Sequence, residues 1–437
     1  MRRRILALLF LASSSLVIRP AGPSQPGSGA KAFVNGQWFT GKDFRRTTFY
    51  AVDGILTQQK PSTPIETVDL QAGFVVPAFA DAHVHFPSTE QNFESSNRAF
   101  LEAGAFYVLN AGGNADTENP LRSKLGTPAA VDAIFAHSVF TCHGGHPQPY
   151  LEYLNEHGVE FGAPFAKTKL EDHYFRTIDS VTDIAVKWPE FLSTKPDFVK
   201  LIFVYSELYQ SSDGGEKSMG LRPDLAAQLV RRAKAAGLRT GAHIEDASDF
   251  HNALMAGVDV IMHLPAFPDP LDRQAAYRNK SNWEERFTIP SSDIELAAKR
   301  DVTVVMTAAA LSAENFEKPN PLNALNENEK RFRKIMIQNI RHLKDAGVRL
   351  AVGSDTMPGA GVLAEIDFLK DANAFSNLEL LQMWSETTPK LIFPQRKIGI
   401  LKDGYEANFL VLAGNPIQDF GNVKRIKLRV KQGEAVP

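Results

Sequence analysis

Residues 74–85 read Phe74-Val75-Val76-Pro77-Ala78-Phe79-Ala80-Asp81-Ala82-His83-Val84-His85, and the rest of the chain is best understood from them. The apolar run predicts a buried strand, and side chains two residues apart on a strand point the same way. His83 and His85 therefore place two imidazoles side by side at the end of a strand, where one divalent metal ion can bind both. An H-x-H pair alone is more often structural than catalytic, so its meaning depends on the polar residues found later in the chain.

After this stretch, short apolar strands alternate with amphipathic helices, which is typical of a parallel α/β fold. The predicted strands end at His85, Asn110, Phe140, Phe203, His243, His263, Ala308 and Asp355. Helices are expected from Arg222 to Gly237, from Ser292-Asp293 as a cap onward, and from Glu329 to Ala346. Eight strands with intervening helices over residues 73–398 predict a (β/α)8 TIM-like barrel. The stretch 150–195 is expected to be an insertion between the third and fourth strands.

Both ends of the chain look β-rich and show no helical period. Turn signals are expected at Asn35-Gly36, between two paired strands, and at Asp53-Gly54. Residues 31–72 and 399–437 are therefore predicted to form one small β-sandwich domain built from both termini.

Residues 1–30 predict a signal peptide and a linker. Arg2-Arg3-Arg4 precedes the apolar run 5–12, and Ala30-Lys31-Ala32 is a candidate processing site. The run is shorter than the ~20 apolar residues of a membrane-spanning helix. We expect export to the periplasm or outside the cell, with no membrane contact in the mature form; an uncleaved anchor and a disordered tail stay open.

Composition narrows the classes of partner. The 437 residues are 43% hydrophobic and 22% charged with a formal net charge of −2, as in ordinary globular proteins. Such a charge predicts no general attraction to nucleic acid or to an anionic membrane. The single cysteine, Cys142, excludes an intramolecular disulfide.

Six polar side chains stand near the ends of predicted strands, which is where barrel enzymes carry their active sites. They are His83, His85, Lys200, His243, His263 and Asp355. Imidazoles and a carboxylate suit zinc and its first-row neighbours. A bound metal ion lowers the pKa of a water from ~15.7 to about 7, giving a hydroxide at neutral pH. Asp355 beside it can take up the proton and return it to a leaving group.

At these positions the chain resembles the amidohydrolase superfamily, a group of metal-dependent hydrolases built on a (β/α)8 barrel. The resemblance covers about residues 31–437 and looks strongest toward imidazolonepropionase-like enzymes and Xaa-Pro dipeptidases. It rests on the H-x-H pair, a lysine in the fourth strand, single histidines after the fifth and sixth strands, and Gly353-Ser354-Asp355 after the eighth. The stretches Thr387-Thr388-Pro389-Lys390 and Ile398–Gly404 are also similar.

The resemblance implies a site with two divalent ions, most simply Zn²⁺. His83, His85 and Asp355 would hold the more buried ion, and His243 with His263 the second. Lys200 would be N-carboxylated and bridge the two ions, which would explain a lysine inside so apolar a strand. One metal ion instead of two, and a paired buried lysine instead of a carbamate, stay open.

Two stretches depart from the family pattern. The usual Ala-Asp near the last strands reads Glu406-Ala407-Asn408, and the loop 141–147 is similar to a Gly-Gly-His substrate loop but continues differently. His143, His146 and Tyr205 are candidate substrate contacts, with loop polarity or surface lining as the alternative.

These observations predict a hydrolase that acts on a C–N bond of an amide, a cyclic amide or a peptide-like small molecule. A lactonase or phosphotriester hydrolase with the same site is the alternative enzyme, because the same metal-activated hydroxide also serves C–O and P–O bonds. A non-catalytic barrel is the alternative from another class. Association into a homo-oligomer is open.

Overall fold

The computed structural model describes residues 29–160, 163–164, 169–210, 219–265, 283–312 and 327–436. Residues 1–28 of the expected signal peptide and linker lie outside the described residues, so export stays a prediction. Within the described ranges, none of the helices combines the length and the apolar character needed to span a bilayer.

The middle of the chain is an α/β structure with parallel strands. Three strands pair in the order β6-β7-β8, and seven pair in the order β12-β9-β13-β14-β15-β16-β17. These strands are β6 (Phe79–Val84), β7 (Ala105–Asn110), β8 (Asp132–Phe135), β9 (Val139–Thr141), β12 (Phe175–Thr177), β13 (Phe198–Ile202), β14 (Arg239–His243), β15 (Val260–Met262), β16 (Thr303–Met306) and β17 (Arg349–Val352). The predicted α/β class with parallel strands is confirmed, and a strand ends within a few residues of each predicted strand end. The strand β12 belongs to the expected insertion and pairs with β9.

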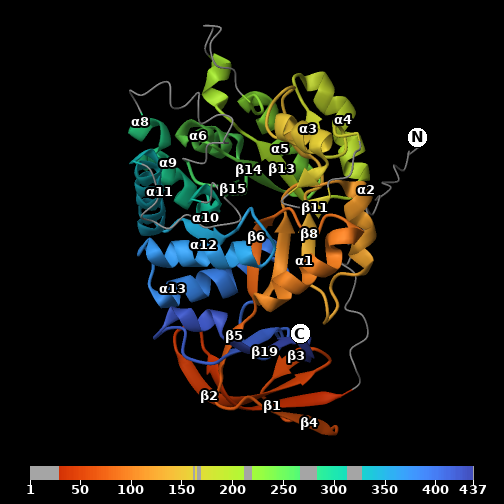
Figure 1. Cartoon of the computed structure of the whole chain (residues 1–437), viewed down its shortest axis with the longest axis vertical. Coiled ribbons are helices and arrows are strands. Elements are labelled where there is room, and N and C mark those ends of the chain that lie inside the picture. Colours follow the sequence, from red (N-terminus) through yellow and green to blue (C-terminus); the bar gives the residue numbers. More distant parts are fainter. Residues whose placement is uncertain are drawn as a thin grey trace, which may run out of the picture.

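Helices lie along the outside of these strands (Figure 1). They are α1 (Glu90–Glu102), α2 (Ala115–Glu118), α3 (Gln148–His157), α4 (Val181–Ser193), α5 (Pro223–Ala235), α6 (Ala247–Ala256), α8 (Trp283–Phe287), α9 (Ser291–Lys299), α10 (Ala308–Ser312), α11 (Glu327–Asp345), α12 (Ala360–Asp371), α13 (Asn377–Gln382) and α14 (Thr388–Ile392), with the short helices η1 (Asn119–Ser123), η2 (Ser206–Gln210), η4 (Met383–Thr387) and η5 (Phe420–Lys424). The helices expected from Arg222 and from Glu329 are confirmed as α5 and α11.

The expected cap of α9 was wrong. This helix begins at Ser291, and its N-cap is Pro290, which makes no side-chain capping bond. Asp293 therefore lies inside the first turn instead of before it, and its carboxylate contacts His251 Nδ1 at 2.9 Å.

The strands β6 and β17 meet at their carboxyl ends. Within the described chain, the amide of Asp355 donates to the carbonyl of His83 at 2.8 Å, but no ladder pairs the two strands. Away from these strand ends, the π-helical turn η4 and the helix α14 fill the gap between β6 and β17, which we call the seam. Trp384 Nε1 donates to Ala80 O at 3.0 Å, and the amide of Val352 donates to Thr388 Oγ1 at 3.0 Å. This seam brings the ends of the first and last parallel strands together.

Strands from both ends of the chain form one further sheet, in the order β20-β19-β18-β5-β1-β2-β3 with β4 beside β1. Red N-terminal and blue C-terminal strands lie side by side at the bottom of Figure 1. They are β1 (Ala30–Phe39), β2 (Phe44–Val52), β3 (Ile55–Thr57), β4 (Ile65–Asp69), β5 (Phe74–Pro77), β18 (Phe409–Leu412), β19 (Ile426–Lys431) and β20 (Glu434–Val436). This sheet includes β5, which lies beyond the expected boundary at residue 72; the division into domains stays a prediction.

One of the two expected turns was wrong. Asn35-Gly36 lies inside β1, where the register shifts between Phe33 and Gly36, so the chain bulges instead of reversing. Asn35 adopts a φ of 56°, and its side-chain Nδ2 donates to Asp69 Oδ1 at 3.0 Å, which anchors the bulge. The turn at Asp53-Gly54 is confirmed between the antiparallel strands β2 and β3.

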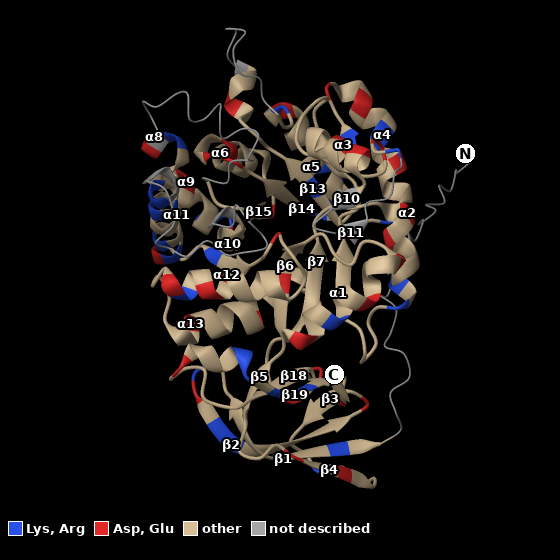
Figure 2. Cartoon of the chain, in the orientation of Figure 1, with Lys and Arg blue, Asp and Glu red and all other residues tan. Residues whose placement is uncertain are grey.

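Apolar side chains of the parallel strands and their covering helices form one continuous core that reaches into the terminal sheet. In the view of Figure 2, acidic and basic residues are interspersed over the outer helices. Most charged side chains therefore lie on the outside of the molecule. The polar side chains that are buried at the strand ends are an exception, and they form the candidate site.

Candidate metal centre

Three of the predicted site residues converge on the carboxylate of a fourth, Asp355. Its Oδ1 lies 3.1 Å from His85 Nε2 and 3.5 Å from His83 Nε2, and its Oδ2 lies 4.0 Å from His263 Nε2. Ligand atoms of His83, His85 and Asp355 all lie within 4.8 Å of one another. Two imidazoles and a carboxylate at this spacing form a donor set that fits a zinc-like ion.

Two of these residues adopt a backbone conformation that L-residues seldom use. His263, directly after β15, has a φ of 77°, and Asp355, three residues after β17, has a φ of 53°. Left-handed backbone outside glycine is uncommon and concentrates at functional sites, where surrounding contacts hold it. The chain therefore turns sharply at both strand ends that deliver these side chains.

Hydrogen bonds fix which ring nitrogen faces the cluster. His85 Nδ1 lies 2.9 Å from the carbonyl of Gly112 and donates to it, so Nε2, which faces Asp355, is the ring nitrogen that can bind a metal ion. His263 Nδ1 lies 2.7 Å from Thr307 Oγ1, a hydroxyl that can accept from it, so Nε2 is the ring nitrogen toward Asp355. Both rings are thus oriented as metal ligands are.

His243 lies beside the first group, and its ring centroid is 4.4 Å from that of His263. Its Nε2 lies 2.9 Å from Glu245 Oε1, so Nε2 donates and Nδ1 is the nitrogen that can bind a metal ion. The ring of His146 stacks on His243 with centroids 4.6 Å apart and an interplanar angle of 24°. This stack brings His146, one of the three predicted substrate contacts, to the histidines.

Lys200 is almost fully buried on β13, at 2% exposure. Its Nζ donates to Met262 Sδ at 3.0 Å, and a thioether is a weak acceptor. Burial lowers the pKa of Lys200 to about 7, although Asp355 raises it. A large part of this amine is therefore neutral near pH 7, which is the form that reacts as a nucleophile or binds a metal ion.

The cluster favours neutral rings and a charged carboxylate. Burial lowers the pKa of His83, His243 and His263 well below the usual value, and Lys200 adds to this effect on each ring. Burial alone would raise the pKa of Asp355, but the hydrogen bond and charge of His85 outweigh it and lower that pKa. Neutral imidazoles and an ionised carboxylate are the forms in which these side chains bind metals.

Two buried carboxyl groups behind the cluster were missed by sequence reasoning. Asp81 Oδ1 accepts from the amide of Ser354 at 2.9 Å, and its Oδ2 accepts from Ser354 Oγ at 2.6 Å, so it anchors the turn before Asp355. Burial raises the pKa of Asp81 to about 7. Strand alternation places Asp81 on the face of His83, a signal that could have found it. Glu365 on α12 carried no comparable signal.

The other two predicted substrate contacts are His143 and Tyr205. His143 is exposed, and its amide donates to Asp179 Oδ1 at 3.2 Å. Tyr205 is buried with a φ of 49°, and the guanidinium of Arg286 lies 4.4 Å from its ring centroid. A role for either residue in binding substrate stays a prediction.

A second group of carboxylates, from Glu207, Asp246 and Asp249, has oxygens within 4.8 Å of one another. Asp246 caps α6, and Asp249 accepts the amides of Tyr205 at 3.1 Å and of Ser206 at 2.8 Å. These bonds tie the loop after β13 to the start of α6, so the group has a structural explanation.

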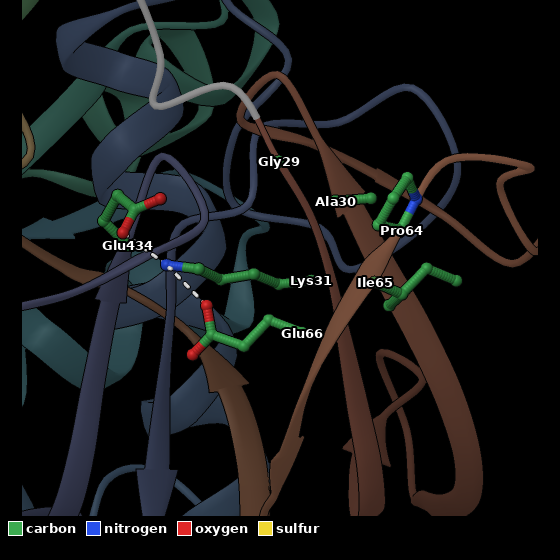
Figure 3. A pocket seen from close by; sticks show the side chains of 7 residues that line it. All are labelled: Gly29, Ala30, Lys31, Pro64, Ile65, Glu66 and Glu434. Carbon is green, nitrogen blue, oxygen red and sulfur yellow. Dashed lines mark hydrogen bonds and ion pairs between the residues drawn. The ribbon is translucent and has the colours of Figure 1, made fainter.

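A cavity of about 510 Å³ opens at the edge of the terminal sheet (Figure 3). Lys31 points into it and pairs with Glu434 and with Glu66, the latter at 3.9 Å. Its lining comes from residues 29–31, 64–66 and 434, none of which belongs to the strands that carry the histidines.

Solved structures of known hydrolases share this fold. Aspergillus niger ochratoxinase has a TM-score of 0.69 at 17% identity, with 93% of this chain and 95% of that chain covered. A prolidase complexed with N-methylphosphonate-L-proline has a TM-score of 0.68 at 17% identity, covering 93% and 99%. Molinate hydrolase has a TM-score of 0.65 at 14% identity, covering 93% and 94%.

Comparison of the amino-acid sequence also finds hydrolases. Ochratoxinase from Aspergillus niger is 24% identical over 213 residues, which are 48% of this chain and 39% of that protein. The match thus spans well under half of the relative. A model described as the amidohydrolase family matches residues 206–436, more than half of the chain. The chain belongs to the amidohydrolase family.

Proposed function

We propose that this protein is a hydrolase with two divalent ions, most simply zinc, that cleaves a C–N bond in a small amide, cyclic amide or peptide-like molecule. The observation that carries the proposal is the convergence of His83, His85 and His263 on Asp355. The family generally uses divalent ions, and hydrolases of C–N bonds are among the proteins with a similar fold, as the prolidase illustrates.

His83, His85 and Asp355 would hold one ion, and His243 with His263 would hold the other. Lys200 would bridge them after its neutral amine attacks CO2, forming a carbamate and releasing one proton. The lowered pKa of Lys200, about 7, supports this step because it makes the neutral amine accessible. Divalent ions bound here would polarise the scissile carbonyl and lower the pKa of a water.

Asp355 would act as the proton shuttle. Its lowered pKa keeps it ionised, so it can accept the proton of the attacking water as the new C–O bond forms. It then gives that proton to the nitrogen as the C–N bond breaks, which leaves Asp355 ionised again. His146, stacked on His243, is the better placed substrate contact, and His143 and Tyr205 are retained as candidates from the loops.

The proposal includes a closed (β/α)8 barrel made of β6, β7, β8 continued by β9, and β13 to β17. Two features support closure. Leu201 of β13 pairs with Phe140 of β9, and the amide of Asp355 after β17 bonds the carbonyl of His83 after β6. A closed barrel would place all six polar side chains at one rim.

Metal content of the wild type and of Lys200→Met, both expressed with bicarbonate, tests the proposal. About two ions per chain, falling sharply in the variant, are expected. Lys431→Met is the matched control, because Lys431 is also a fully buried lysine but pairs with Asp132 at 2.7 Å, away from the histidines. That control should keep both ions.

The other outcomes are equally specific. One ion per chain, unchanged in Lys200→Met, would contradict the bridge and indicate a mononuclear site. Metal-free wild type that takes up no zinc would favour a non-catalytic barrel. With a loaded protein, hydrolysis of lactones or phosphotriesters but of no amide or dipeptide would contradict the choice of bond.

A further inference from the structure

Glu365 is a buried carboxyl group outside the predicted ligand set. It lies on α12 with 0% exposure, and its Oε2 accepts the amide of Ala309 at 2.6 Å. The amide of Ala308 also bonds it, so the carboxyl group holds the first residues of α10. Burying a carboxyl group costs free energy, and burial raises the pKa of Glu365 to about 8. The hydrogen bonds from the amides of Ala308 and Ala309 must offset that cost.

The segment that Glu365 holds is connected to the metal centre by one residue. Thr307 directly precedes α10, and its Oγ1 lies 2.7 Å from His263 Nδ1. On its other side Thr307 follows β16, whose last residue, Met306, pairs with Val352 of β17. The position of the Thr307 hydroxyl is therefore set by the sheet on one side and by the Glu365 contact on the other.

His263 needs such support more than an ordinary ligand does. Its φ of 77° is a conformation that a side chain disfavours. Its ring lies between two others, with centroids 4.6 Å from His83 and 4.4 Å from His243. A small tilt of this ring would move its Nε2 relative to both.

We propose that Glu365 is a positioning residue for the metal ligand His263, acting through the first turn of α10 and the hydroxyl of Thr307. The proposal rests on the proposed function in taking His263 as a ligand. Glu365 fixes the backbone at the start of α10, and this backbone positions the adjoining Thr307. The Thr307 hydroxyl accepts a hydrogen bond from His263 Nδ1, which leaves Nε2 to bind the ion.

The zinc affinity of each variant, measured by competition with a chromophoric chelator, tests whether Glu365 acts on His263 through Thr307. Thr307→Val and Glu365→Leu should each weaken zinc binding by about 10- to 100-fold, the usual effect of losing a partner of a ligand. Thr307→Ser keeps the hydroxyl and Glu365→Gln keeps an acceptor oxygen, so both should stay near wild type. The double variant Thr307→Val/Glu365→Leu should bind no more weakly than Thr307→Val alone, because both changes break one path.

Thr240→Val is the matched control, since Thr240 is a buried threonine whose Oγ1 lies 2.9 Å from Asp259 Oδ2 at the start of β14. It should lose stability without losing zinc. Additive losses in the double variant, or wild-type affinity in Glu365→Leu, would overturn the proposal.

A second measurement separates the positioning role from the proposed function. With selectively ¹⁵N-labelled histidine, NMR reports the tautomer of His263 with or without zinc. We expect the Nδ1–H form in wild type and its loss in Thr307→Val and Glu365→Leu. If wild type binds no zinc but the tautomer still follows these variants, the metal function fails and the positioning role stands; an unchanged tautomer in both variants would overturn the positioning role itself.

Discussion

At the scale of single residues, Asp355 combines two demands on one side chain. It must be ionised next to three imidazoles, and it must tolerate a φ of 53°. Aspartate and asparagine accept the left-handed conformation more readily than other side chains. Position 355 therefore allows a substitution that changes the charge without changing the backbone.

Asp355→Asn should separate chemistry from folding. We expect kcat to fall by about 10²- to 10⁴-fold, the usual contribution of a general acid or base, with a melting temperature close to wild type. Asp355→Ala should lose the same activity and also stability, by about 1–2 kcal/mol for the left-handed conformation. Steady-state kinetics on an amide or dipeptide substrate and thermal unfolding measure the two effects. Near-normal kcat in Asp355→Asn would place proton transfer on another group.

At the scale of elements, the approach of β17 to β6 requires Gly353. A Cβ there would lie 2.5 Å from Val305 Cγ1 and 2.9 Å from the Cβ of His83. Distances this short demand that a strand move, since both contacted atoms belong to packed neighbours. The glycine of Gly353-Ser354-Asp355 thus serves the close contact between the two strand ends.

Gly353→Ala should push the end of β17 away from His83. We expect a loss of about 1–3 kcal/mol in the free energy of unfolding, as for other overpacked cores, together with weaker zinc binding. Gly29→Ala is the control, because a Cβ at Gly29 meets nothing within 4 Å. Denaturant unfolding and the zinc competition assay report the two effects. An alanine variant with unchanged stability and affinity would show that the seam is less tightly packed than the distances indicate.

The elements also show what the sequence could predict. Apolar runs ending in polar residues located the parallel strands and brought out His83, His85, His263 and Asp355, because strand direction alone decides which rim they share. The Asn35-Gly36 signal failed because its turn chemistry fits a bulge as well as a hairpin.

The residues that support the metal ligands could not be predicted from the sequence, for a different reason. Glu365 contacts the site through the backbone of another element, and no spacing in the sequence encodes such a contact. Thr307 is an exception, since it follows the apolar strand β16 and the strand-end argument applied there would have found it.

At the scale of the whole molecule, a buried ionic cluster ties the terminal sheet to the parallel strands. Asp132 at the start of β8 bonds Lys431 of β19 at 2.7 Å and Arg396 at 2.7 Å. Arg396 also pairs with Glu406, and Asn408 donates to Tyr107 at 2.8 Å. Glu406 and Asn408 therefore complete the contact between the two parts of the chain.

Asp132→Asn should weaken this contact in a pH-dependent way. Burial alone would raise the pKa of Asp132, but Lys431 and Arg396 lower it below its usual 3.8. A carboxyl group whose folded pKa is depressed stabilises the fold fully above its unfolded pKa, and this contribution is lost as pH falls through the folded value. At neutral pH we expect the variant to lose about 3–5 kcal/mol, as when one member of a buried pair is removed. Urea unfolding should show that the difference from wild type is constant from pH 8 to pH 5 and shrinks below 3.8.

The matched control for this prediction is Asp367→Asn, which removes a largely exposed partner of Lys424. Exposed pairs contribute about 0–1 kcal/mol, so this variant should stay close to wild type at every pH. An equal loss in both variants would mean that the cluster around Asp132 contributes no more than a surface pair. A loss in Asp132→Asn that persists undiminished at low pH would mean that packing, and not the charge of Asp132, joins the terminal sheet to the parallel strands. In either case the free energy that holds the two parts of the chain together would have to come from the apolar core that they share.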